Sequence, residues 1–115
     1  MKKSEIHFNI ELDDNSIPDK IFWEATDNPN EGLSDTRAIS INVWDHYHKG
    51  TLSLPLWTKD MEVHEMKRFF IETIGSSAET LRSATGDDKM ADLIDELCVV
   101  LTKNLQAEMK EAGQK

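Results

Sequence analysis

The chain has 115 residues, a formal net charge of −9 and acidic residues spread over its whole length. Up to Trp57 it carries five Lys and Arg against ten Asp and Glu, and beyond that point eight against twelve. Phosphate backbones and anionic lipid surfaces are bound through basic patches, so this composition argues against binding to nucleic acid or to membranes. The length suits one hydrophobic core, and we expect a single domain over residues 1–115.

The cysteine count and the apolar runs bear on the cellular compartment. Cys98 is the single cysteine, so no internal disulfide can form, which fits a reducing compartment. Residues 1–5 lead straight into alternating sequence without the apolar stretch of a signal peptide, and no run reaches the length of a membrane span. We therefore expect a soluble, cytoplasmic protein that does not insert into membranes.

The first half alternates between apolar and polar residues, which is typical of half-buried strands. Residues 6–12 place apolar side chains two apart, a segment rich in turn formers follows at 13–19, and a second strand is expected over residues 20–26. This pair predicts a β-hairpin. Residues 27–34 contain proline and glycine among polar residues, and they are predicted to form a loop.

A second hairpin is predicted downstream. Apolar residues alternate over residues 39–43 and again over 52–56, on either side of a turn at 45–50. β-Branched residues favour a strand in the first of these runs, and Pro55 indicates an edge position or a bulge in the second. Two consecutive hairpins predict a four-stranded, mostly antiparallel sheet over about residues 3–57.

The apolar spacing then changes to three or four residues, which indicates an amphipathic helix. Thr58 or Asp60 is expected to cap its start. Gly75, followed by two serines, predicts a kink or break, and Gly86 ends the helix.

A second helix is expected to open at Asp87 and Asp88, whose carboxylates suit the positive end of a helix. The two helices together occupy about residues 60–112. Strands followed by helices predict an α+β fold in which both helices pack on one face of the sheet.

The turn formed by Asp45, His46, Tyr47 and His48 is the richest polar cluster. Two histidines two residues apart beside a carboxylate are typical ligands of a transition metal. A small-ligand or metal-binding domain that uses Asp45, His46 and His48 is therefore the alternative interpretation. Such a metal site needs three or four convergent ligands, and no second half-site is apparent. A solvated hairpin turn is the simpler interpretation, and we expect no metal and no cofactor.

Nothing in the sequence predicts catalysis. Cys98 falls on the apolar side of the last helix, where a cysteine behaves as a small hydrophobic residue. The chain contains neither a Gly-x-Ser-x-Gly elbow nor a glycine-rich phosphate loop. We expect that the protein is not an enzyme.

The aromatic residues of the second hairpin are the candidate partner-binding residues. Trp44 is out of phase with the apolar residues of its strand, so it points to the opposite face of the sheet. Trp57 is out of phase with the leucines of the next strand, so Trp44 and Trp57 could share one face. If the helices cover the apolar face, Trp44 is an exposed anchor; otherwise both faces are partly covered, or Trp44 caps the sheet edge. Tyr47 and His46 in the adjoining turn complete the candidate set.

Several segments resemble the gliding-motility protein C (GldC) family. The resemblance is carried by Lys2-Lys3-Ser4-Glu5-Ile6-His7-Phe8, Ala25-Thr26-Asp27, Asn30-Glu31-Gly32-Leu33, Ala38-Ile39-Ser40, Trp44-Asp45-His46-Tyr47, Leu56-Trp57-Thr58-Lys59, Glu65-Met66-Lys67-Arg68-Phe69, Ala78-Glu79-Thr80-Leu81-Arg82 and Ala84-Thr85-Gly86-Asp87. It implies a soluble accessory component associated with gliding motility and the linked secretion apparatus. It implies no catalytic activity and no cofactor, so it assigns no functional residues. One departure concerns the start of the first helix, where the expected proline is missing from Met61-Glu62-Val63.

Two hypotheses follow. The first is a non-catalytic interaction protein, whose expected partners are components of the gliding and secretion machinery, with homodimerisation through the sheet face or edge as a related arrangement. The second is the small-ligand or metal-binding domain at the 45–48 turn.

Overall fold

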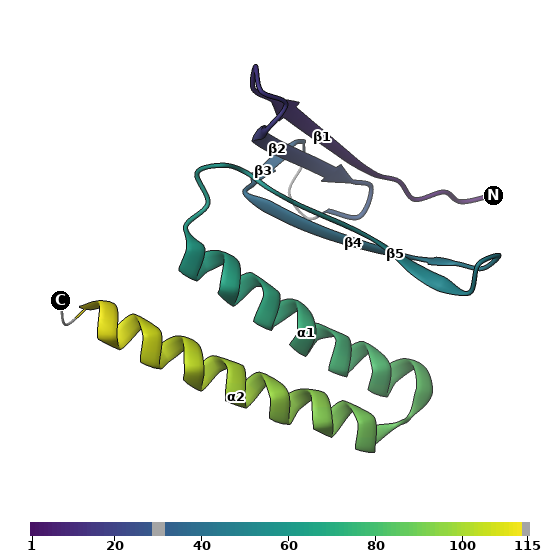
Figure 1. Cartoon of the computed structure of the whole chain (residues 1–115). Helices are drawn as coiled ribbons and strands as arrows, with labels where there is room; N and C mark the ends of the chain where they lie inside the picture. Colours follow the sequence, from purple (N-terminus) through teal and green to yellow (C-terminus); the bar gives the residue numbers. More distant parts are fainter. Residues whose placement is uncertain (29–31, 114–115) are drawn as a thin grey trace. The chain divides into compact units, whose positions relative to one another are not determined.

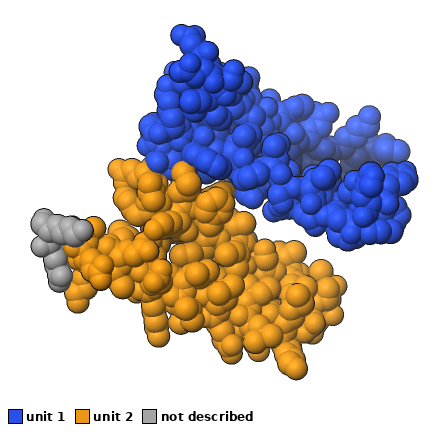
Figure 2. All heavy atoms as spheres, in the orientation of Figure 1, with its two compact units in different colours: residues 1–61 blue, residues 62–115 orange. Residues whose placement is uncertain are grey.

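The computed structural model describes residues 1–28 and 32–113, in which five strands are followed by two helices (Figure 1). The chain divides into two compact units, Met1–Met61 and Glu62–Lys115, which Figure 2 shows in different colours. The first unit holds the strands and the second holds the helices, so the predicted α+β class is confirmed. Part of the loop predicted over 27–34 lies outside the described residues.

The first three strands form an antiparallel sheet in the order β1-β2-β3. These strands are β1 (Ile6–Leu12), β2 (Pro18–Ala25) and β3 (Ser34–Thr36). Asp13 holds the first turn, because its carboxylate accepts the backbone N–H groups of Asn15 at 2.8 Å and Ile17 at 3.0 Å. The predicted first hairpin is thus confirmed, while β3 was not foreseen.

The other two strands form a separate two-stranded antiparallel ribbon, which we call the β4–β5 ribbon. It consists of β4 (Ala38–Asp45) and β5 (Gly50–Trp57), paired without a register shift from Ala38↔Trp57 to Asp45↔Gly50. The expected single four-stranded sheet is therefore wrong. The reason is that β3 pairs with β2 and occupies the edge that β4 would have needed.

The buried residues of the first unit come from both of its sheets. Ile21 of β2 and Ile39 of β4 are buried, and so is the polar residue Thr58 just after β5. The backbone N–H of Thr58 donates to the carbonyl of Arg37 at 2.8 Å, which ties the end of β5 to the start of β4. Burial of these apolar side chains supplies most of the driving force, at about 1.5–3 kcal/mol for each large residue.

Lys59, just after β5, connects this part of the chain to the first hairpin through its backbone and its side chain. Its backbone N–H donates to the carbonyl of Pro18 at 3.1 Å, and its Nζ lies 3.1 Å from Asp13 Oδ2. The N–H of Ile17 and then the Lys59 ammonium lower the pKa of Asp13 below its ordinary value.

The second unit is a pair of helices joined by a short turn, α1 (Val63–Thr85) and α2 (Asp88–Gly113). Gly86 ends α1 in the left-handed conformation at φ 72°, and its N–H donates to the carbonyl of Arg82. Asp87 caps α2 by accepting the N–H of Met90 at 3.0 Å. Both features agree with the sequence-based predictions.

The helices approach closely because small residues lie between them. Ala78 of α1 and Ala91 of α2 are fully buried, and a Cβ at Gly75 would lie 3.6 Å from Cys98 Sγ. Of the kink or break predicted at Gly75, the break is wrong, because α1 runs through this position as one helix. The contact with Cys98 of α2 requires only a small residue at this position, and the packing of the two helices tolerates the low helix propensity of glycine.

Ion pairs join the helices at both ends. Lys67 Nζ lies 2.7 Å from Glu108 Oε2, while Arg82 lies 2.7 Å from Asp92 and 2.6 Å from Asp95. These pairs are largely exposed, so each contributes little to stability. They fix the direction of the two helices, with the start of α1 beside the end of α2.

The start of α1 differs from the prediction. Its N-cap is Glu62, which makes no side-chain capping bond. Thr58 and Asp60 are used elsewhere, since the Thr58 hydroxyl donates to Asp60 Oδ1 at 2.6 Å and Asp60 pairs with Arg37. The predicted packing of both helices on one sheet face, and the single domain, stay predictions. Neither helix of the described part is long and apolar enough to cross a membrane.

Two glycine substitutions should change stability in opposite directions. Gly75→Ala should raise the free energy of unfolding by about 0.5–1 kcal/mol, because alanine favours a helix and the new methyl group meets Cys98 at ordinary contact distance. Gly86→Ala should lower it by about 1–2 kcal/mol, because φ is 72° there. Urea unfolding followed by circular dichroism measures both. Destabilisation by Gly75→Ala would contradict the packing described.

Candidate functional site

The two candidate tryptophans lie on the same face of the β4–β5 ribbon. Trp44 pairs with Thr51 and Trp57 pairs with Ala38. Cross-strand partners share a face, and so do residues two apart along a strand. The shared face predicted for Trp44 and Trp57 therefore follows from the observed register.

The tryptophans do not form one cluster, however. Position 51, opposite Trp44, is six residues from Trp57 along β5, which is about 20 Å of strand. Between them lies a polar strip in which the Ser53 hydroxyl donates to Asn42 Oδ1 at 2.7 Å. Trp44 is 59% exposed and Trp57 is 45% exposed. The face thus offers two separate aromatic anchors rather than a single hot spot.

The opposite face of the ribbon is also exposed near its turn. Val43, Leu52 and Leu54 lie on that face, and Leu52 is 63% exposed. Ile39, at the other end of β4 on the same face, is buried. The alternation revealed this apolar face but not its exposure, because alternation shows which residues share a face and not what covers that face.

Asp45 organises the turn at the end of the ribbon. Its Oδ1 accepts the backbone N–H groups of Tyr47 at 3.0 Å and His48 at 3.2 Å, and its Oδ2 lies 2.7 Å from His48 Nδ1. The Tyr47 side chain is 91% exposed, and its ring meets the His46 ring edge to face at 6.0 Å between centroids. The turn therefore presents two exposed rings on a rigid base.

The same geometry bears on the metal-binding alternative. The Asp45 carboxylate is occupied by the turn, and His46 Nδ1 lies 3.3 Å from the Lys49 ammonium. The ligand atoms of Asp45, His46 and His48 do not converge within the 4.8 Å that a shared ion needs. The structure thus does not bring these three residues together as a metal centre.

Another group meets that distance within the described residues, namely Glu62, His64 and Glu65 at the start of α1. All three are exposed, and His64 Nε2 lies 3.2 Å from Glu62 Oε2. The positive end of a helix disfavours a cation there. The group was not predicted from the sequence, although two glutamates flank a histidine within four residues.

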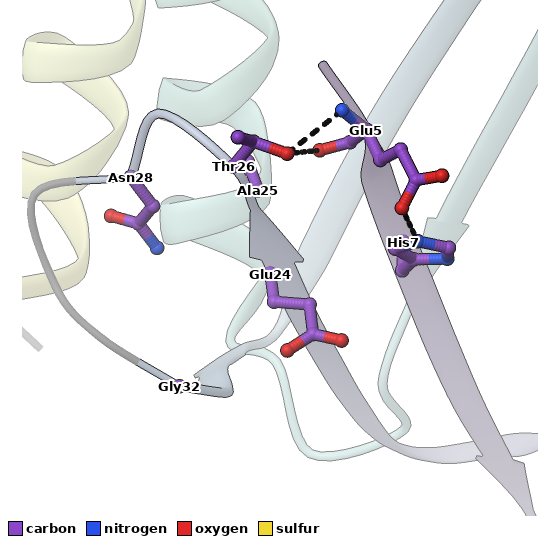
Figure 3. A pocket seen from close by; sticks show the side chains of 7 residues that line it. All are labelled: Glu5, His7, Glu24, Ala25, Thr26, Asn28 and Gly32. Atoms are coloured by element: carbon purple, nitrogen blue, oxygen red, sulfur yellow. Dashed lines mark hydrogen bonds and ion pairs between the residues drawn. The ribbon is translucent and has the colours of Figure 1, made fainter. Parts of the chain in front are cut away.

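A polar pocket of about 360 Å³ lies at the junction of β1 and β2 (Figure 3). The Thr26 hydroxyl accepts the N–H of Glu5 at 2.9 Å, and Glu5 Oε2 lies 3.2 Å from His7 Nε2. Glu24 adds a second carboxylate to the lining. These residues form no sequence motif, because they lie about 20 positions apart in the chain. They come together only through the pairing of β1 with β2.

Comparison with known proteins identifies the family of the chain. Residues 18–107 match the model of a family described as "Gliding motility-associated protein GldC-like". The matched part includes both strands of the β4–β5 ribbon and most of the helical unit. Neither the curated proteins nor the solved structures contain a match.

The stability contributed by Asp45 should depend on pH. The hydrogen bond from the His48 ring, together with the backbone N–H of His48, lowers the pKa of Asp45 below its ordinary value. A lowered pKa in the folded state stabilises the protein above about pH 4, and this contribution is lost as the pH falls through the folded-state pKa. Asp45→Asn should therefore destabilise the protein most near pH 7 and least at the lowest pH.

Urea unfolding at a series of pH values measures this difference. Asp14→Asn is the matched control, because it changes a carboxylate in the other hairpin turn and leaves the contact between Asp45 and His48 intact. A difference for Asp45→Asn that stays constant with pH would contradict the stabilising role of the ionised carboxylate.

Proposed function

Because the chain belongs to the GldC-like family of gliding motility-associated proteins, we propose that it is a non-catalytic accessory component that acts by binding other proteins of the gliding machinery and the linked secretion machinery. A cytoplasmic location is part of this proposal. The family match supports the association with motility. The mode of action has to be argued from the exposed surface.

The observation that carries the proposal is the exposure of aromatic side chains along the β4–β5 ribbon. Trp44 and Trp57 are exposed on the ribbon, which is paired over its full length, and Tyr47 is exposed in the turn that joins its strands. Tryptophan and tyrosine are enriched among the residues that dominate protein interfaces, because they offer large contact areas at a low cost in conformational entropy. Trp44 is the anchor we favour, with His46 and Tyr47 beside it in the turn.

The environment of the single cysteine supports the part of this proposal that assigns no catalytic activity to the protein. Cys98 is partly buried in the helix pair, close to Gly75, and its Sγ lies 3.8 Å from the carbonyl of Ile71. A thiol that packs between helices acts as a filler, whereas a catalytic nucleophile needs access and a neighbouring base.

Substitution Trp44→Ala should weaken partner binding and leave the fold intact. The side chain is mostly exposed, so its removal should change the free energy of unfolding by less than about 1 kcal/mol. Loss of a tryptophan anchor costs about 2 kcal/mol of binding, or roughly 30-fold in affinity. In a gliding bacterium that carries the chain, the variant should co-purify with less of the machinery, and colonies should spread more slowly.

Leu93→Ala is the matched control, because Leu93 has a similar exposure of 57% but belongs to α2 of the other unit. Mass spectrometry of the co-purified proteins and the rate of colony spreading are compared among the wild type and the two variants. The proposed site is wrong if Trp44→Ala recovers as much of the machinery as Leu93→Ala. The proposed function is wrong if the wild-type protein recovers none of it.

A further inference from the structure

Pro55 determines which backbone groups of the β4–β5 ribbon point outward. Ser40 lies opposite Pro55, and a proline cannot donate the N–H that a hydrogen-bonded pair requires. Hydrogen-bonded and non-hydrogen-bonded pairs alternate along an antiparallel ladder, so every second pair from this one is also non-hydrogen-bonded. The outward-directed N–H and C=O groups of β4 therefore belong to Ala38, Ser40, Asn42 and Trp44.

Within the part of the chain that the structure describes, this outer edge of β4 is unpaired beyond Ala38, whose carbonyl accepts the Thr36 hydroxyl at 3.3 Å. Within the described residues the ribbon contains only two strands, so no strand pairs with the outer edge. Proteins usually protect such an edge with lysine, proline or a bulge. The outer edge of β5 has Pro55, whereas residues 38–44 contain neither proline nor a charged residue, and their register is regular. β4 is thus a ready template for another strand.

We propose that a second copy of this chain pairs with β4 edge to edge, antiparallel about a two-fold axis near Ile41 and Asn42. The result is a continuous four-stranded sheet in the order β5-β4-β4-β5. This inference rests on the proposed function, because it names one protein that the β4–β5 ribbon binds.

Charge favours a second copy at this place. Each chain carries a net charge of −9, so two copies repel each other except where their surfaces are neutral. Residues 38–44 are uncharged, and the Asp45 carboxylate that follows is held in the turn. The exposed apolar residues of α2 offer a poorer contact, because they alternate with acidic residues at 88, 92, 95 and 96.

The side chains also fit this pairing. Antiparallel strands about a two-fold axis keep equivalent faces together, so Ile39, Ile41 and Val43 of both copies lie on one apolar face. On the other face Trp44 lies across from Ala38 or Ser40 of the second copy. Both residues are small, and they leave room for the indole ring.

The dimer should be weak. An edge of eight residues buries less surface than the roughly 800 Å² per partner of a standard interface, so we expect a dissociation constant in the micromolar range. Sedimentation velocity over concentrations from about 1 to 300 µM should show a monomer that converts to a dimer. Because the copies repel each other, added salt should strengthen the dimer.

Asn42→Lys tests the edge itself. It places a charge on β4 beside its equivalent in the second copy, and it should abolish the dimer. Ser53→Lys is a closely matched control, because Ser53 lies directly across from Asn42 on the same face but on β5. Each variant loses the same hydrogen bond between these side chains and raises the net charge to about −8, so each should equally reduce long-range repulsion.

Three results would overturn the inference: a wild-type protein that stays monomeric at every concentration, equal loss of the dimer in both variants, or a dimer that salt dissociates. Thermal unfolding confirms that each variant is folded. A monomeric wild type that still recovers the gliding machinery would leave the proposed function standing. A wild-type dimer that recovers none of the machinery would remove the proposed function and leave the pairing at β4 intact.

Discussion

The architecture of the first unit depends on the pairing of β3 with β2. This strand has only three residues, Ser34–Thr36, yet it covers the edge of β2 that the next strand would otherwise join. The chain therefore leaves the first sheet at Arg37 and starts a new ladder at Ala38. The separate ribbon and the unpaired edge of β4 both follow from that early closure.

The sequence predicts elements well where a period is strong. The alternation over residues 6–12 coincides with β1, and the change to helical spacing marks the second unit. β3 escapes prediction because Ser34, Asp35 and Thr36 show no apolar alternation; tertiary pairing alone makes them a strand. Gly75 misleads for a related reason, since its local propensity breaks helices while contact with α2 favours a small residue.

For the candidate site too, part of the arrangement follows from the sequence pattern, and part follows from contacts that exist only in the folded chain. Periodicity places Trp44 and Trp57 on one face, which depends only on strand phase. Their separation depends on the register of the hairpin, which is set by the turn at Asp45. The convergence of metal ligands is more demanding still. A metal site would need the Asp45 carboxylate and both histidine rings to face the same point. This carboxylate is instead held by its hydrogen bonds within the turn.

Pro55 has a consequence for how far an assembly can grow. A ribbon with two usable edges can accept a neighbour on each side, and such growth has no natural end. Here Pro55 has no backbone N–H to donate on the outer edge of β5. The outer edge of β4 is in turn occupied once two copies have paired. In the proposed dimer, association through this ribbon is therefore self-limiting, and the open edge of β4 would not seed fibres.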